Sequence, residues 1–111
     1  MPTEQYFGMR LTTERRNLLK RIAANTGATY DDTSFANLRR TEAEPYIAAI
    51  CKALGLDPGN WGGMTSAVDF ALQSTLVLVT GGETVEVKEG ETALMLALRW
   101  MAEWVEQRQD G

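Results

Sequence analysis

The stretch QYFGMRLTTERRNLLKRIAANTG, residues 5–27, says most about how this chain folds. Its first part alternates, so that Phe7, Met9 and Leu11 fall on one side of an extended backbone and polar or small residues fall on the other. Apolar alternation of this kind is typical of a strand with one buried face. We therefore predict a β-strand over residues 5–11.

The second part of this stretch has helical spacing. Thr12 or Thr13 can cap a helix with its hydroxyl oxygen, and Gly27 is a suitable residue to end it. Between them, apolar residues occupy one side and basic or polar residues the other, which predicts an amphipathic helix over 13–26. The apolar side consists of Leu18, Leu19, Ile22 and Ala23.

Three further helices are predicted from apolar periodicity. The first covers 42–54 and ends at Gly55, and the second begins at Thr65 or Ser66. The third covers 92–107 and is apolar around so much of its circumference that we expect it to be buried on two sides, one of them a subunit interface. The expected interface residues are Leu94, Leu98, Met101 and Trp104.

Residues 76–87, LVLVTGGETVEV, are interpreted as a two-residue β-hairpin, because paired glycines supply the positive φ angles that such turns need. Pairing the two arms around the glycines gives one wholly aliphatic face. The alternative is a helix that runs from Thr65 through Val79 and also keeps an apolar stripe. With the hairpin, the prediction is an α+β fold with an N-terminal strand and about four helices.

Composition predicts one small domain. The chain has 111 residues, of which 44% are hydrophobic and 23% charged, as in globular proteins. We divide it into a strand–helix unit (5–27), an insertion with one helix (28–64) and a helix–hairpin–helix unit (65–108). Residues 1–40 carry seven basic and four acidic groups, whereas residues 41–111 carry four basic and eleven acidic groups. An anionic partner should therefore meet the N-terminal third.

Several functional classes are excluded by what the sequence lacks. There is no histidine and a single cysteine, Cys51, so neither a structural zinc cluster nor a histidine-dependent nucleophile system can be built. We expect no catalytic residues, no metal and no cofactor. A lone cysteine forms no intramolecular disulfide, which fits the cytoplasm. No apolar run approaches the roughly 20 residues that span a bilayer, so we expect no membrane partner.

The residues 6–27, together with TSAVDFALQSTL at 65–76, resemble the ribbon-helix-helix DNA-binding family, with residues 28–64 inserted between the two helices. In that family two subunits pair their N-terminal strands into a ribbon that enters the major groove of duplex DNA. The resemblance implies a homodimeric transcriptional regulator. It implies base contacts by Tyr6, Gly8 and Arg10, and phosphate contacts by Arg15, Arg16, Lys20, Thr65 and Ser66.

Two other interpretations stay open. Residues 22–40 and 53–56 also bear a faint resemblance to helix-turn-helix repressors of the phage type. Alternatively, strand 5–11 joins the hairpin in a sheet within one chain, and the protein is a non-catalytic interaction or assembly module that uses the apolar face of helix 92–107. The pairing of strand 5–11 distinguishes these, because pairing between subunits favours DNA binding and pairing within the chain favours the interaction module.

Overall fold

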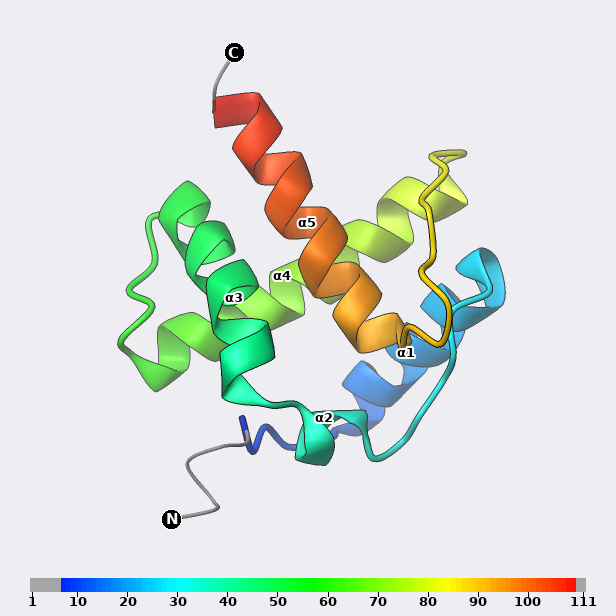
Figure 1. Ribbon diagram of the computed structural model, residues 1–111, viewed down its shortest axis with the longest axis horizontal. Helices are drawn as coiled ribbons and strands as arrows, with labels where there is room; N and C mark the ends of the chain where they lie inside the picture. Colours follow the sequence, from blue (N-terminus) through cyan, green and yellow to red (C-terminus); the bar gives the residue numbers. More distant parts are fainter. Residues whose placement is uncertain (1–6, 110–111) are drawn as a thin grey trace.

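Five α-helices account for the regular structure of the computed structural model, which describes residues 7–109 (Figure 1). They are α1 (Thr13–Thr26), α2 (Ser34–Asn37), α3 (Arg40–Leu54), α4 (Trp61–Thr80) and α5 (Ala93–Gln109). Within residues 7–109 there is no strand, and the only β-type contact is an isolated bridge between Thr29 and Thr92. The predicted α+β class is therefore wrong, since the described chain is all-helical.

Helix α5 lies at the centre of the packing. In the view of Figure 1, α5 crosses in front of α4. Helix α3 lies beside α5, and α1 lies below the C-terminal half of α4. The largest contacts are those of α3 with α5 and of α1 with α4, and α4 also packs on α3 and α5. Burial of α5 on several sides explains why its sequence is apolar around most of its circumference.

The predicted ends of α1 are confirmed. The Thr12 hydroxyl accepts a hydrogen bond from the Arg15 backbone N–H at 3.2 Å. At the other end Gly27 has φ +88°, and its N–H bonds to the carbonyl of Ala23, as in a left-handed helix cap. Helix α3 also ends at Gly55, as predicted. Local capping signals were sufficient to place these ends.

The hairpin predicted over 76–87 is wrong, because α4 continues through the first half of this segment to Thr80. Leu72 and Leu76 are buried while Val77 is 68% exposed, which is helical rather than alternating burial. An aliphatic run of four residues fits both periods. A helix already formed from Trp61 onward extends without a new nucleation cost, which favours the helical state.

Residues 83–88, after α4, have no regular secondary structure and pair with no strand in the described chain. Val85 and Val87 are half-buried against the core. Between them, the Glu86 carbonyl accepts a hydrogen bond from Nη2 of Arg99 at 2.7 Å. A side chain of α5 therefore supplies a hydrogen bond that a partner strand would otherwise have given.

Helix α4 begins at Trp61, four residues before the earlier of the two predicted starts, Thr65. Asn60 caps it, since its Oδ1 accepts hydrogen bonds from the N–H groups of Gly62 and Gly63. A Cβ on Gly63 would lie 2.3 Å from the carbonyl oxygen of Asp57, so this close approach of loop and helix requires glycine.

The segment before α1 keeps the alternation of its sequence but not the strand. Phe7 and Met9 are buried, and Gly8 and Arg10 are exposed. The Phe7 N–H donates to the carbonyl of Leu38 at 2.7 Å, and no ladder follows. Within residues 7–11, the predicted strand 5–11 is therefore wrong, although its buried face was identified.

Candidate nucleic-acid interface

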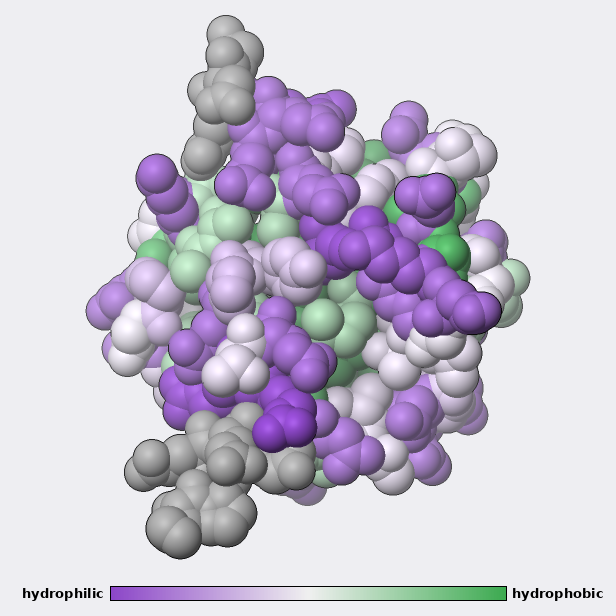
Figure 2. Space-filling view, viewed as in Figure 1, coloured by the Kyte–Doolittle hydropathy of each residue, from purple (hydrophilic) through white to green (hydrophobic). Residues whose placement is uncertain are grey.

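Five basic side chains in the N-terminal part of the chain are exposed and make no ion pair within the described residues. They come from the segment before α1, from α1 itself and from the residue before α3. Figure 2 shows hydrophilic residues gathered over the region of α2 and the start of α3, where two of these segments meet. The five are Arg10, Arg16, Lys20, Arg21 and Arg39.

Arg15 differs from these five because its guanidinium is bound within the chain. Its Nε and Nη2 donate to the two carboxylate oxygens of Asp69 on α4, at 2.9 and 3.2 Å, and its Nη1 donates to the carbonyl of Arg10 at 2.9 Å. A forked contact of this kind fixes the guanidinium in place. Arg15 thus joins α1 to α4, and its guanidinium is engaged in an internal ion pair.

The three expected base-contact residues are placed differently. Arg10 is exposed on the segment before α1, and its side chain is available to a ligand. Gly8 is exposed with φ +73° and presents no side chain. Tyr6 lies outside the described residues. Of this set, Arg10 alone offers a described side chain that can bind an anion or a base edge.

Arg16 and Lys20 lie one helical turn apart on α1, and both are exposed. The Lys20 Nζ lies 5.5 Å from the ring centroid of Tyr30, within the range of a cation–π contact. Two acidic residues, Asp31 and Asp32, follow Tyr30 in the sequence. Hydrogen bonds from the Thr33 hydroxyl and backbone N–H lower the pKa of Asp31, so this carboxylate stays charged.

Thr65 and Ser66 were expected to start a helix and to hold a phosphate with free N–H groups. They instead lie in the second turn of α4, where backbone N–H groups bond to carbonyls four residues earlier. The Thr65 hydroxyl donates to the carbonyl of Gly62 at 3.1 Å. Helix α4 begins after its cap residue Asn60, so the backbone N–H groups of Thr65 and Ser66 are not unpaired donors at the start of a helix.

The expected subunit interface on the last helix is mostly core. Leu94, Leu98 and Met101 are fully buried inside a single chain, and Trp104 is only partly buried. The excess of apolar residues on α5 is thus explained by its contacts with α3, α4 and α1 rather than by a second subunit.

An apolar groove remains on the surface between the C-terminal halves of α4 and α5. Its volume is about 470 Å³. The indole of Trp104 closes one side, with the guanidinium of Arg108 3.5 Å from the ring centroid. In Figure 2, hydrophobic residues reach the surface near the end of α4. The lining residues are Phe70, Gln73, Ser74, Val77, Leu78 and Trp104.

A second, polar hollow of about 510 Å³ lies between α1 and α4. The Arg15–Asp69 ion pair forms part of its wall, and Arg21 and Glu14 contribute one charge of each sign. Because opposite charges are mixed along this wall, the hollow does not select for an anion or a cation.

Neither a metal site nor a reactive thiol is found in the described part of the chain. No group of three or more potential ligands among histidine, cysteine, aspartate and glutamate lies together in residues 7–109. Cys51 is buried, and burial raises the pKa of its thiol, which keeps it protonated and unreactive. None of the described helices is both long and apolar enough to cross a membrane.

Comparisons of this chain with protein-family models, with curated proteins and with solved structures find no match. The arguments on function therefore rest on the residues themselves. The structure adds two residues to the candidate interface that the family resemblance does not include, Arg39 and Trp61. Each lies next to the segment before α1 through a tertiary contact, the Phe7–Leu38 hydrogen bond and the Phe7–Trp61 ring contact respectively.

Proposed function

We propose that this chain is a small, non-catalytic, cytoplasmic nucleic-acid-binding regulator that acts on duplex DNA as a homodimer. The observation that carries the proposal is the set of exposed basic side chains without ion pairs in residues 7–109, at Arg10, Arg16, Lys20, Arg21 and Arg39. Phosphate contacts by such side chains provide most of the sequence-independent affinity of DNA-binding proteins. The lone cysteine and the lack of histidine support a cytoplasmic location and a role without catalysis.

The uneven charge supports this surface over the rest of the molecule. Residues 7–40 carry seven basic and three acidic groups, whereas residues 41–109 carry four basic and ten acidic groups. A polyanion is therefore attracted to one end of the protein and repelled from the other. The ribbon-helix-helix resemblance also implies phosphate contacts by Arg16 and Lys20, whereas the base contact that it implies for Arg10 depends on a strand that residues 7–11 do not form.

The test is binding of a fluorescent 20-bp duplex of random sequence, followed by anisotropy at about 50 and 200 mM salt. We expect affinity to fall steeply with salt. The Arg16→Ala/Lys20→Ala double variant should reduce the slope of log K against log salt by about 0.9 for each phosphate that is no longer neutralised. Lys52→Ala is the matched control, because Lys52 is an exposed cation on α3, in the acidic part of the chain.

Two results would reject this function. The first is no binding of duplex by the wild-type protein at low salt, since even sequence-specific proteins keep the electrostatic contribution. The second is an equal loss of binding free energy per cation removed in the Lys52→Ala control and in the double variant, which would show that net charge rather than this surface determines binding.

The α4–α5 groove favours a second candidate function, an interaction module whose partner is a second copy of the chain. Val77 is 68% exposed beside the groove that it helps to line. A projecting side chain and a hollow on one face suit a two-fold contact, in which each copy inserts the same residue into the other. This arrangement would also supply the homodimer of the first proposal.

Val77→Asp tests this contact. We expect the wild-type protein to show the mass of a dimer by light scattering at high concentration, and the variant to show that of a monomer, since a buried unpaired carboxylate opposes association. The control is Leu54→Asp, which places the same charge on another exposed apolar position. A wild-type mass of 12.3 kDa at all concentrations would contradict the contact.

A further inference from the structure

Trp61, the first residue of α4, is an exposed aromatic side chain at the edge of the core. It is 50% exposed, and its ring packs against Phe7 with centroids 5.0 Å apart and planes tilted by 31°. Phe7 itself is buried. Phe7 thus supports the indole from the protein side, while half of the Trp61 surface remains open to solvent.

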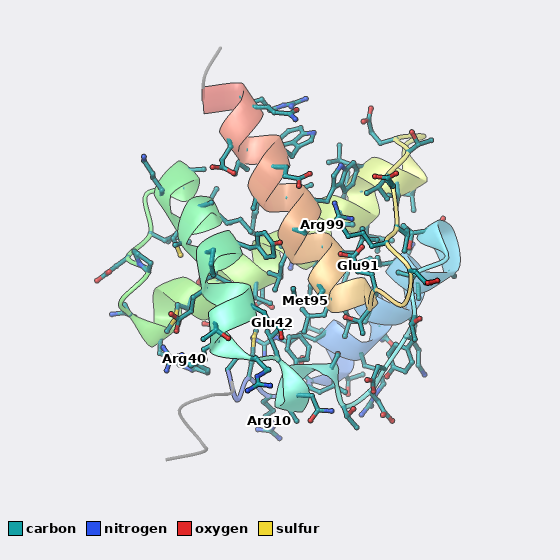
Figure 3. All side chains as sticks on the ribbon, in the orientation of Figure 1. Arg10, Arg40, Glu42, Glu91, Met95 and Arg99 are labelled. Carbon is teal, nitrogen blue, oxygen red and sulfur yellow. The ribbon has the colours of Figure 1, made fainter. Side chains whose placement is uncertain are left out.

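Two exposed arginines come from segments that contact the same Phe7. Arg10 follows it by three residues, and Arg39 follows Leu38, whose carbonyl accepts the Phe7 N–H. Neither arginine makes an ion pair in the described chain, whereas Arg40 is held by Glu44 at 2.6 Å. In Figure 3, Arg10 and Arg40 extend outward at the same end of the molecule, below α3 and beside α2.

Of the acidic groups near this surface, Glu42 is exposed and makes no ion pair in the described chain, whereas two others are committed to local contacts. Glu44 pairs with Arg40, and the Asp57 carboxylate accepts the N–H of Gly59. The N–H groups at the start of α4 are likewise taken by the Asn60 side chain. The indole and the two arginines remain available to a ligand.

An aromatic face flanked by cations is the combination that proteins use to bind unpaired nucleotides, with the base stacked on the ring and the phosphates near the cations. A base inside a duplex is already stacked on its neighbours and cannot use such a face. We propose that Trp61, with Arg10 and Arg39, forms a stacking site for an unpaired base of single-stranded nucleic acid. This inference rests on the proposed function, since it concerns the same basic surface.

The experiment compares a fluorescein-labelled 12-nucleotide oligo-dT with the 20-bp duplex by anisotropy at low salt. We expect Trp61→Ala to weaken oligo-dT binding on the order of 10-fold and duplex binding less than about 2-fold, because stacking on this ring is open only to unpaired bases. Trp61→Phe should retain most of the affinity. Leu54→Ala is the matched control, since Leu54 is another exposed large apolar residue and should change neither affinity.

A second measurement covers the case in which Trp61→Ala does not fold. Oligo-dT should quench the tryptophan fluorescence of the wild-type protein, and Trp61→Phe should lose this quenching while it still binds. Duplex binding with no oligo-dT binding, or oligo-dT binding that is unaffected by either substitution, would overturn the stacking site alone. Absence of duplex binding in the wild-type protein would overturn the proposed function, and absence of both kinds of binding would overturn the stacking site as well.

Discussion

Replacement of Arg99 by methionine is expected to lower the free energy of unfolding by about 3–5 kcal/mol, because it leaves a buried carboxylate without its partner. Arg99 lies on α5, and its Nε and Nη2 donate to the two carboxylate oxygens of Glu91 at 2.8 and 2.9 Å. The two side chains are only 8% and 9% exposed. Figure 3 shows them directed toward each other, one from the helix and one from the preceding loop.

The same arginine holds the loop between α4 and α5. Its Nη2 also bonds to the Glu86 carbonyl, so a single guanidinium contacts both ends of the segment 86–91. The Lys88 N–H donates to the Glu91 carboxylate as well, at 3.1 Å. Loss of Arg99 would remove three of these hydrogen bonds together, and we expect the loop to detach from α5.

The loss of stability in Arg99→Met is expected to depend on pH. Burial raises the pKa of Glu91, but hydrogen bonds from Arg99 and from the Lys88 N–H outweigh burial and leave this pKa below its ordinary value. A carboxyl with a lowered folded-state pKa adds stability above its unfolded pKa of about 4.3, and this contribution disappears as the pH falls through the folded-state value. Without the guanidinium in Arg99→Met, burial dominates the Glu91 pKa, so acid should reduce the penalty instead of adding to it.

The measurement is urea unfolding followed by circular dichroism between pH 3.5 and 7. Glu103→Gln is the control, since Glu103 is 54% exposed and lies 3.8 Å from Arg99, and we expect a change below about 0.5 kcal/mol. The double variant Glu91→Gln/Arg99→Met removes both charges and should regain part of the stability. A decrease of less than about 1 kcal/mol in Arg99→Met, with the pH profile of the wild type, would contradict a buried pair.

The sequence predicted those parts of the fold that depend on neighbouring residues. Thr12 and Gly27 placed the ends of α1, and Gly55 placed the end of α3, because caps act within a few residues of the backbone groups that they satisfy. The prediction for segment 76–80 was wrong for the opposite reason. Its aliphatic side chains suit a strand or a helix, and the choice depends on how α4 packs against α5.

The sequence predicted only part of the candidate site, again because it shows local patterns but not contacts between distant residues. Exposure of Arg16 and Lys20 follows from their position outside the apolar side of the amphipathic helix, which includes Leu19 and Ile22. Arg15 could not be separated from them, because its partner Asp69 lies 54 residues away in the sequence. An ion pair between residues so far apart leaves no local sequence pattern from which it could be predicted.

Replacement of Leu98 by alanine distinguishes a core residue from an interface residue on α5. Leu98 is fully buried within one chain, and truncation of a buried leucine costs about 2–5 kcal/mol, since the smaller side chain leaves a cavity. We therefore expect a large fall in the urea midpoint and no change of molecular mass under native conditions. Leu54→Ala is the control, because this exposed side chain lies outside the α4–α5 groove and its truncation should change stability by less than about 0.5 kcal/mol.

The opposite outcome for Leu98→Ala would support the subunit interface that the sequence predicts on α5. If this residue faced a second subunit, its truncation would shift the mass toward that of the monomer, and the decrease in stability would depend on protein concentration. Core packing predicts the same decrease at every concentration. Because α5 packs against α3, α4 and α1 in one chain, its buried apolar residues need no second subunit to cover them.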